Sequence, residues 1–182
     1  MRHVPKDRLV WALALLCGCG EPAAEPKVAA ARPVVAAADD GVGYDLRRLR
    51  PRDEETLAVM FDRQLAQAAK DGKRAAVLFS ADWCEPCRQL ETELGNRHPA
   101  SAIGDVRILE LKEEDWVAAT RMDEFDALRR RWTGNTGSYP LLILLDEKGG
   151  KREEMKEAKE RLNAARAPDT LAHWFADTRP AG

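Results

Sequence analysis

The chain has 182 residues, of which 45% are hydrophobic and 33% are charged, and its formal net charge at pH 7 is −2. This length accommodates one globular domain of ordinary size plus an extension. Acidic and basic residues are interspersed, so the charge pattern gives no reason to expect a nucleic-acid partner, and we interpret the run Arg129-Arg130-Arg131 as part of a solvated helix face.

The first eighteen residues have the layout of an export signal. Basic residues precede the apolar run 9–16, which is too short to span a bilayer. The run ends in Leu16-Cys17-Gly18-Cys19, which resembles the bacterial lipoprotein signal with Cys19 as the lipidated residue. We therefore expect a signal peptide at 1–18 and an exported lipoprotein that faces the periplasm and is anchored to a membrane through Cys19. The alternative is an ordinary signal cleaved near residues 23–24, which would give a soluble periplasmic or secreted protein.

Residues 19–50 are predicted to form a tether, and residues 51–182 a single folded domain. The segment 20–43 is rich in Ala and Pro, contains no aromatic residue and shows no sustained periodicity. Such a composition is typical of a disordered linker. The prediction is therefore a lipid anchor joined by a flexible segment to a folded domain.

The domain is predicted to begin with an amphipathic helix that starts at Asp53 and stops at Asp71-Gly72, since apolar residues recur there at helical spacing. Residues 75–80 form a continuous apolar run and are predicted to be a buried strand. A second helix follows from Arg88 to about Leu94, and residues 95–104 are predicted to be a loop.

Two thiols, Cys84 and Cys87, stand at the junction between this strand and the second helix. A helix N-terminus has unpaired backbone N–H groups and a partial positive charge, and both favour a thiolate. We therefore predict that Cys84 is the nucleophile and that its pKa lies below the ~8.5 of an ordinary thiol. Cys87 lies one turn further along the same helix face, within reach of a disulfide, and is the predicted resolving thiol. Pro86 suits the first helical turn.

A Cys-x-x-Cys pair also occurs as half of a zinc site, which needs two further Cys or His ligands. Cys17 and Cys19 lie in the leader, and the three histidines are scattered without ligand spacing. We therefore predict a redox pair and no metal.

The second half of the domain is predicted to add two more buried strands. Residues 105–111 are the first of them, parallel to the strand before the cysteines, and residues 139–145 are the other. Between them, the charged stretch 112–132 is predicted to contain a helix that packs on the sheet, with Trp116 and Trp132 as packing residues.

The C-terminal part begins with the segment 146–150, which has the composition of a hairpin turn. Residues 151–167 are rich in Lys, Glu and Ala, and an edge strand and a helix both fit them. A last helix is predicted to start at Asp169 or Thr170 and to turn its apolar residues toward the core, namely Leu171, Trp174 and Phe175.

The segment from Lys73 to Cys87 resembles the active-site strand and helix of thioredoxin-like proteins, particularly the periplasmic thioredoxin-like domains of disulfide-reducing membrane systems. Its core is Ala81-Asp-Trp-Cys-Glu-Pro-Cys87, and a weaker likeness extends from about Asp53 to about Asp177. The resemblance implies an α/β fold with a central mixed β-sheet flanked by helices. It also implies a cis peptide bond at Tyr139-Pro140 and a substrate-binding surface formed by Trp83, Tyr139 and Pro140.

Two positions depart from the family pattern. Six residues before the first cysteine the family usually has a buried acid that exchanges a proton with the resolving thiol, and this chain has Leu78. Another acid, or water, would have to replace it. Glu110 can face the sheet interior from the neighbouring strand, although a solvent-facing residue is an equally good interpretation, and the other candidates are Asp82 and Glu85. The second departure is the pair Glu-Pro between the cysteines in place of the commoner Gly-Pro.

These observations predict a membrane-tethered thiol-disulfide oxidoreductase that reduces or exchanges protein disulfides through Cys84 and Cys87. Its expected partners are protein disulfide substrates and an upstream thiol or disulfide electron donor, and it is expected to need no cofactor besides its redox-active disulfide. The alternative is a non-catalytic binding module or a Cu(I) carrier that uses the same two thiols.

Overall fold

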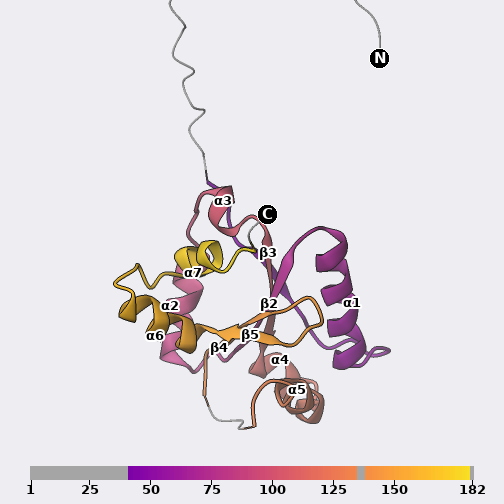
Figure 1. Cartoon of the computed structure of the whole chain (residues 1–182). Helices are drawn as coiled ribbons and strands as arrows, with labels where there is room; N and C mark the ends of the chain where they lie inside the picture. Colours follow the sequence, from indigo (N-terminus) through magenta and orange to yellow (C-terminus); the bar gives the residue numbers. More distant parts are fainter. Residues whose placement is uncertain (1–40, 135–137, 181–182) are drawn as a thin grey trace, which may run out of the picture. The chain divides into compact units, whose positions relative to one another are not determined.

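The computed structural model describes residues 41–134 and 138–180 (Figure 1). In chain order its elements are β1 (Asp45–Arg48), α1 (Leu57–Lys70), β2 (Arg74–Ser80), α2 (Glu85–Leu94), α3 (Ala100–Ile103), β3 (Val106–Lys112), α4 (Glu113–Ala118), α5 (Met122–Arg129), β4 (Leu141–Leu145), β5 (Lys151–Glu154), α6 (Met155–Ala164) and α7 (Leu171–Asp177).

The five strands form one mixed sheet in the order β1-β3-β2-β4-β5. β1 and β2 both run parallel to β3, whereas β4 runs antiparallel to β2 and β5 antiparallel to β4. The inner strands β2, β3 and β4 are almost wholly buried. Continuous burial is expected of strands that are covered on both faces. The predicted α/β fold with a central mixed sheet is confirmed.

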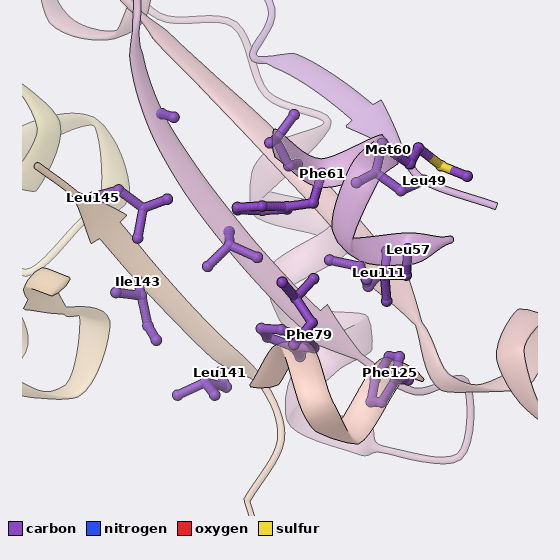
Figure 2. Close-up of a cluster of buried hydrophobic side chains, with 14 of the residues drawn as sticks. Leu49, Leu57, Met60, Phe61, Phe79, Leu111, Phe125, Leu141, Ile143 and Leu145 are labelled. Atoms are coloured by element: carbon purple, nitrogen blue, oxygen red, sulfur yellow. The ribbon is translucent and has the colours of Figure 1, made fainter. Parts of the chain in front are cut away.

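Helices cover both faces of this sheet, so the core has two halves. One half lies under α1, α4 and α5 and is shown in Figure 2. It contains Phe61, Phe79 and Phe125, and the rings of Phe79 and Phe125 meet edge to face at a centroid distance of 5.3 Å. The other lies under α2, α3, α6 and α7, around Leu78, Ile108 and the aromatic residues of α7. Figure 1 shows α1 on one side of the strands and α2, α6 and α7 on the other. Each buried strand therefore sends alternate side chains into different halves of the core.

The N-terminal boundary of the domain differs from the prediction. Residues 45–48, which we placed in the tether at 19–50, form β1 and pair with β3, and Leu49 is buried in the core. The sequence did not predict β1 because the strand is short and three of its four residues are exposed. The predicted signal peptide at 1–18 and the tether up to residue 40 lie outside the described residues. Among the helices of the described part, none has the length and apolar character needed to cross a bilayer.

The first helix begins later than predicted, at Leu57 instead of Asp53. Thr56 caps it, because its side-chain oxygen accepts a hydrogen bond from the Val59 amide at 3.4 Å. The Leu57 amide donates to the Glu124 carboxylate at 2.7 Å, which satisfies another free donor of the first turn. The acidic residues before Thr56 therefore precede the helix and do not form its first turn.

Three other segments are more divided than the sequence suggested. The stretch 112–132 contains two helices, α4 and α5, separated at Thr120, whose positive φ of 54° interrupts helical geometry. Residues 151–167 hold both a strand and a helix, because Glu154 ends the pairing of β5 and forms a capping box with Glu157 that starts α6. The loop 95–104 includes the short helix α3.

Asp105 ties the starts of β2 and β3 to the chain after α7. It accepts hydrogen bonds from Arg74 Nε at 2.8 Å and from Arg179 Nη2 at 2.7 Å. Burial alone would raise the pKa of Asp105, but the bonds from Arg179 and Arg74 outweigh burial and lower the pKa to about 2. A carboxyl group whose pKa is lowered by folding stabilises the fold above its unfolded pKa, and this stabilisation is lost as the pH falls toward the folded pKa.

We therefore expect Asp105→Asn to reduce the free energy of unfolding at neutral pH by about 1 kcal/mol, allowing for solvent screening. The difference from the wild type should close as the pH falls from about 4 to about 2. Urea unfolding at several pH values measures it, with Asp62→Asn as the control because that carboxylate is exposed and pairs with Arg131 on the surface. A difference that stays constant down to the lowest pH would contradict the assignment.

Candidate redox site

Cys84 and Cys87 lie where β2 leads into α2 and form a disulfide, with their Cα atoms 5.2 Å apart. Cys84 is the N-cap residue of α2, and its sulfur accepts a hydrogen bond from the Cys87 amide at 3.2 Å. Pro86 occupies the first turn, where no N–H is needed. Both cysteines are buried, and Cys84, at 4% exposed, is slightly more accessible than Cys87, at 1%. The N-terminus of α2 is therefore directed at the sulfur that was predicted to be the nucleophile.

Three neighbouring elements hold the loop that precedes the cysteines. The Asp82 amide donates to Glu114 of α4 at 2.8 Å, and its carboxylate accepts from Lys112 of β3 at 2.7 Å. Arg88 of α2 donates to the Asp82 carbonyl at 2.8 Å and forms an ion pair with Glu85. The Arg88 charge offsets the Glu85 carboxylate, which would otherwise oppose a thiolate at Cys84. The loop is thus anchored at both its amide and its carbonyl.

An aromatic rim lies beside the disulfide. Trp83 is 67% exposed, and its ring meets the ring of Tyr139 edge to face at a centroid distance of 5.6 Å. Tyr139 packs against the small buried cluster of Ala81, Cys84 and Cys87. The Tyr139–Pro140 peptide bond is cis, as the family resemblance implied. Trp83 and Tyr139 are therefore brought together beside Cys84, and Pro140 directly follows Tyr139 in the chain.

Our interpretation of the run 129–131 as a solvated helix face is wrong for its first residue, Arg129. Arg130 and Arg131 are exposed, but Arg129 is only 2% exposed. Its guanidinium carbon lies 4.5 Å from the centroid of the Tyr139 ring, and its Nη2 donates to the Ser138 carbonyl at 2.9 Å. Burial raises the pKa of Tyr139, and the neighbouring Glu113 carboxylate adds to this, so the phenol under Arg129 stays protonated. Arg129 therefore supports the Tyr139 ring and the residue before it. The sequence did not predict this role because runs of basic residues are usually solvated.

Glu110 is buried, so the interpretation of it as a solvent-facing residue is wrong. It is 4% exposed and pairs in register with Leu78, the position at which the family usually has its acid. Register partners point to the same face of a sheet, here the face covered by α2. Burial raises the pKa of Glu110, and the charges of Lys112 and Arg48 offset part of the increase. The negative charge of the Glu91 carboxylate, one helical turn beyond Cys87, raises the pKa of Glu110 further.

The two other candidate acids are placed less favourably. A hydrogen bond from Lys112 lowers the pKa of Asp82, which makes this carboxylate a weaker base. Glu85 is exposed and engaged by Arg88. Within the described residues, no group of three or more His, Cys, Asp and Glu side chains is arranged to hold a metal ion. Cys19, the predicted lipidation site, lies outside the described residues.

The sequence matches the family model of the thioredoxin-like domain over residues 61–165, which is more than half of the chain. The chain therefore belongs to the thioredoxin-like family. A search of curated proteins finds no match.

Several solved structures are similar to this chain. A disulphide isomerase from Xylella fastidiosa Temecula1 is 21% identical, with 71% of this chain and 96% of that chain covered and a TM-score of 0.42. A poplar thioredoxin h mutant is 17% identical, with coverages of 76% and 88% and a TM-score of 0.47. The DsbD C-terminal domain of Neisseria meningitidis, in its oxidised form, is 20% identical, with coverages of 54% and 82% and a TM-score of 0.42.

Proposed function

We propose that this protein is a thiol-disulfide oxidoreductase that reduces or exchanges protein disulfides through Cys84 and Cys87. The observation that carries the proposal is the hydrogen bond from the Cys87 amide to the Cys84 sulfur at the N-terminus of α2. In the reduced protein, this amide and the helix terminus favour the thiolate of Cys84, which is the form that attacks disulfides. No cofactor besides the cysteine pair enters the proposed reaction.

The reaction transfers two electrons from the protein to its substrate. The Cys84 thiolate attacks one sulfur of the substrate disulfide, so a mixed disulfide forms and the other substrate sulfur leaves as a thiolate. Cys87 then loses its proton and attacks the Cys84 sulfur, which closes the Cys84–Cys87 disulfide and releases the second substrate thiolate. The protein is now oxidised and the substrate reduced. An upstream thiol donor restores the dithiol by the same exchange in reverse.

Glu110 is the proposed acceptor of the Cys87 proton. Cys87 is almost fully buried, and burial without a nearby base disfavours its thiolate. Glu110 lies beside Leu78 on the face covered by α2, and its raised pKa brings its basicity closer to that of a thiolate. Proton transfer from Cys87 to Glu110 would therefore be less unfavourable than transfer to an ordinary carboxylate.

The rim of Trp83, Tyr139 and Pro140 is the proposed substrate surface. Trp83 offers a large exposed aromatic face directly before Cys84, and Tyr139 supports it edge to face. Such a surface suits an extended polypeptide with apolar side chains around its disulfide. In the cell, we place the domain on the periplasmic side of a membrane, held by a lipid on Cys19, with protein disulfides and a thiol donor as partners.

Insulin reduction tests the proposed activity. The full chain, kept reduced by dithiothreitol, should accelerate insulin precipitation, and Cys84→Ser should lower the rate to that of dithiothreitol alone. The control is Cys87→Ser: once it has been reduced and freed of dithiothreitol, it should retain the first attack on insulin and accumulate a mixed disulfide at Cys84 that is visible as a mass increase. Stoichiometric Cu(I) binding by a chain without turnover would contradict the proposal and support a carrier.

A further inference from the structure

A basic hollow of about 750 Å³ lies on the surface formed by β1, the segment that follows it, and α1. Among the described residues that line it, Asp71 is the only acidic one and none is a lysine. The basic residues of the hollow are Arg47, Arg48, Arg50, Arg52, Arg63 and Arg107. Trp83, Cys84 and Tyr139 are not part of its lining, and β3 lies between β1 and the strand that leads to the cysteines.

The carboxylates around the hollow do not balance its arginines. Asp45 accepts from Arg47, Lys73 and Arg107 at 2.8, 2.6 and 2.9 Å, so one carboxylate serves three cations. Asp115 is shared between Arg48 at 2.8 Å and Arg50 at 3.9 Å. Asp71 accepts from Arg107 at 2.8 Å, and Glu55 pairs with Arg63 at 2.8 Å. Among the described residues, these four carboxylates face the six arginines and Lys73, so positive charge is left over even where ion pairs form.

Two of the arginines carry most of this excess. The Arg50 side chain is 68% exposed, and its shared contact to Asp115 is long. Arg52 forms no ion pair with any residue in the described part of the chain. The acidic residues next in sequence, Asp53 and Glu54, line a different hollow. Guanidinium groups bind carboxylates through two parallel N–H donors, so this surface suits an anion with several carboxylates.

The strand beside the hollow has a free edge. Among the described strands, β1 pairs only with β3, so its outer backbone groups have no strand partner. The outward amide of Leu46 donates to the Tyr44 carbonyl at 3.0 Å, which leaves Arg48 as the outward-facing residue whose backbone can pair with an added strand. Leu46 on this edge is 39% exposed. The arginines extend from residue 47 to residue 52, a span of about 17 Å if this segment is fully extended. An elongated anion fits this spacing better than a point charge does, and a peptide strand can also pair with the outer backbone groups of β1 that remain.

We propose that the β1 edge and its arginine hollow form a second binding site, which takes an extended, Asp- and Glu-rich segment of a partner protein. The segment adds to the sheet beside β1 and places its carboxylates against Arg50 and Arg52. Because the redox site lies elsewhere, a partner held at β1 leaves the Cys84–Cys87 disulfide accessible. Docking at one site raises the effective concentration of the partner's thiols at the other. Binding at this site does not depend on the function proposed above; only its benefit for disulfide exchange rests on that function.

Fluorescence anisotropy of the full chain with a labelled ten-residue peptide of alternating Asp and Val tests the proposal. The double variant Arg50→Glu/Arg52→Glu should bind the peptide at least about tenfold more weakly than the wild type. The control Arg130→Glu/Arg152→Glu changes the net charge equally at two exposed arginines outside the hollow, and should stay within about twofold. Both double variants should reduce insulin at the wild-type rate, because all four side chains lie outside the redox site.

Three outcomes would overturn the proposal. Equal weakening by the two double variants would mean that net charge, and not the hollow, attracts the peptide. Unchanged binding of a peptide N-methylated at alternate residues would exclude pairing with the β1 edge. Binding to vesicles containing phosphatidylglycerol without any binding of the acidic peptide would assign the arginines to a membrane surface. If charge reversal unfolds the chain, Arg50→Gln/Arg52→Gln replaces it, and undiminished peptide binding by that variant would refute the site.

Discussion

Glu110→Gln is expected to slow the release of the mixed disulfide by about tenfold or more, while the first attack by Cys84 stays unchanged. Glutamine keeps the shape of the side chain but has no basic oxygen of comparable strength, so Cys87 would lose its proton acceptor. Single-turnover kinetics separates the two steps, because the mixed disulfide forms in the first and disappears in the second. Asp82→Asn is the control, since Lys112 already lowers the basicity of that carboxylate.

Leu78→Asp tests the same idea in the opposite direction. Leu78 pairs in register with Glu110, so an aspartate there would place a second carboxyl group beside the first. We expect it to accelerate release of the mixed disulfide, and to restore release when combined with Glu110→Gln. If the folded Leu78→Asp variant resolves at the wild-type rate, proton acceptance was never limiting, and the leucine at this position has no kinetic consequence.

Glu110→Gln should also change how the stability of the fold depends on pH. Because burial raises the pKa of Glu110 in the folded state, its ionisation destabilises the fold. This loss of stability is absent below the pKa that Glu110 has in the unfolded chain, and it is complete above its pKa in the folded protein. Glu110→Gln should therefore be more stable than the wild type at alkaline pH, and this advantage should shrink as the pH falls toward about 4. An advantage that does not vary with pH would mean that the carboxyl group titrates normally.

Arg129→Ala is expected to destabilise the fold by about 2 kcal/mol and to reduce the kcat/KM for a protein disulfide by about tenfold. The substitution removes the charge over the Tyr139 ring and the bond to the Ser138 carbonyl, so the segment that carries Pro140 loses its support. Cys84 itself is not touched, and its rate with a small aromatic disulfide should be nearly unchanged.

Denaturant unfolding and parallel assays with insulin and the small disulfide measure these effects. Arg130→Ala is the matched control, because Arg130 is the next residue and is exposed. Arg129→Lys should recover part of the stability, since it restores the charge without the planar donor group. Equal losses on both substrates would show that Arg129 acts on the cysteines and not on the rim.

The strand–helix junction with its two thiols was predictable because its determinants are local. A continuous apolar run indicates a buried strand, and a cysteine followed by proline two positions later suits the start of a helix. The hairpin turn before β5 and the cap at Thr170 were predictable for the same reason, since each depends on residues a few positions apart. The family resemblance added the cis bond at Pro140, which local sequence alone does not determine.

Only the tertiary structure decided which charged residues are buried. Alternation along β3 predicted that Glu110 points to the face opposite to Leu109 and Leu111, but not whether that face is buried. The register with Leu78 and the packing of α2 show that it is an interior face. Arg129 is buried because the residues just before β4 pack against it at the end of α5. No pattern within the triplet 129–131 predicts this burial. β1 joined the sheet through pairing with β3, about sixty residues away in sequence. Burial and strand pairing depend on distant segments meeting in space, which is why periodicity and composition did not reveal them.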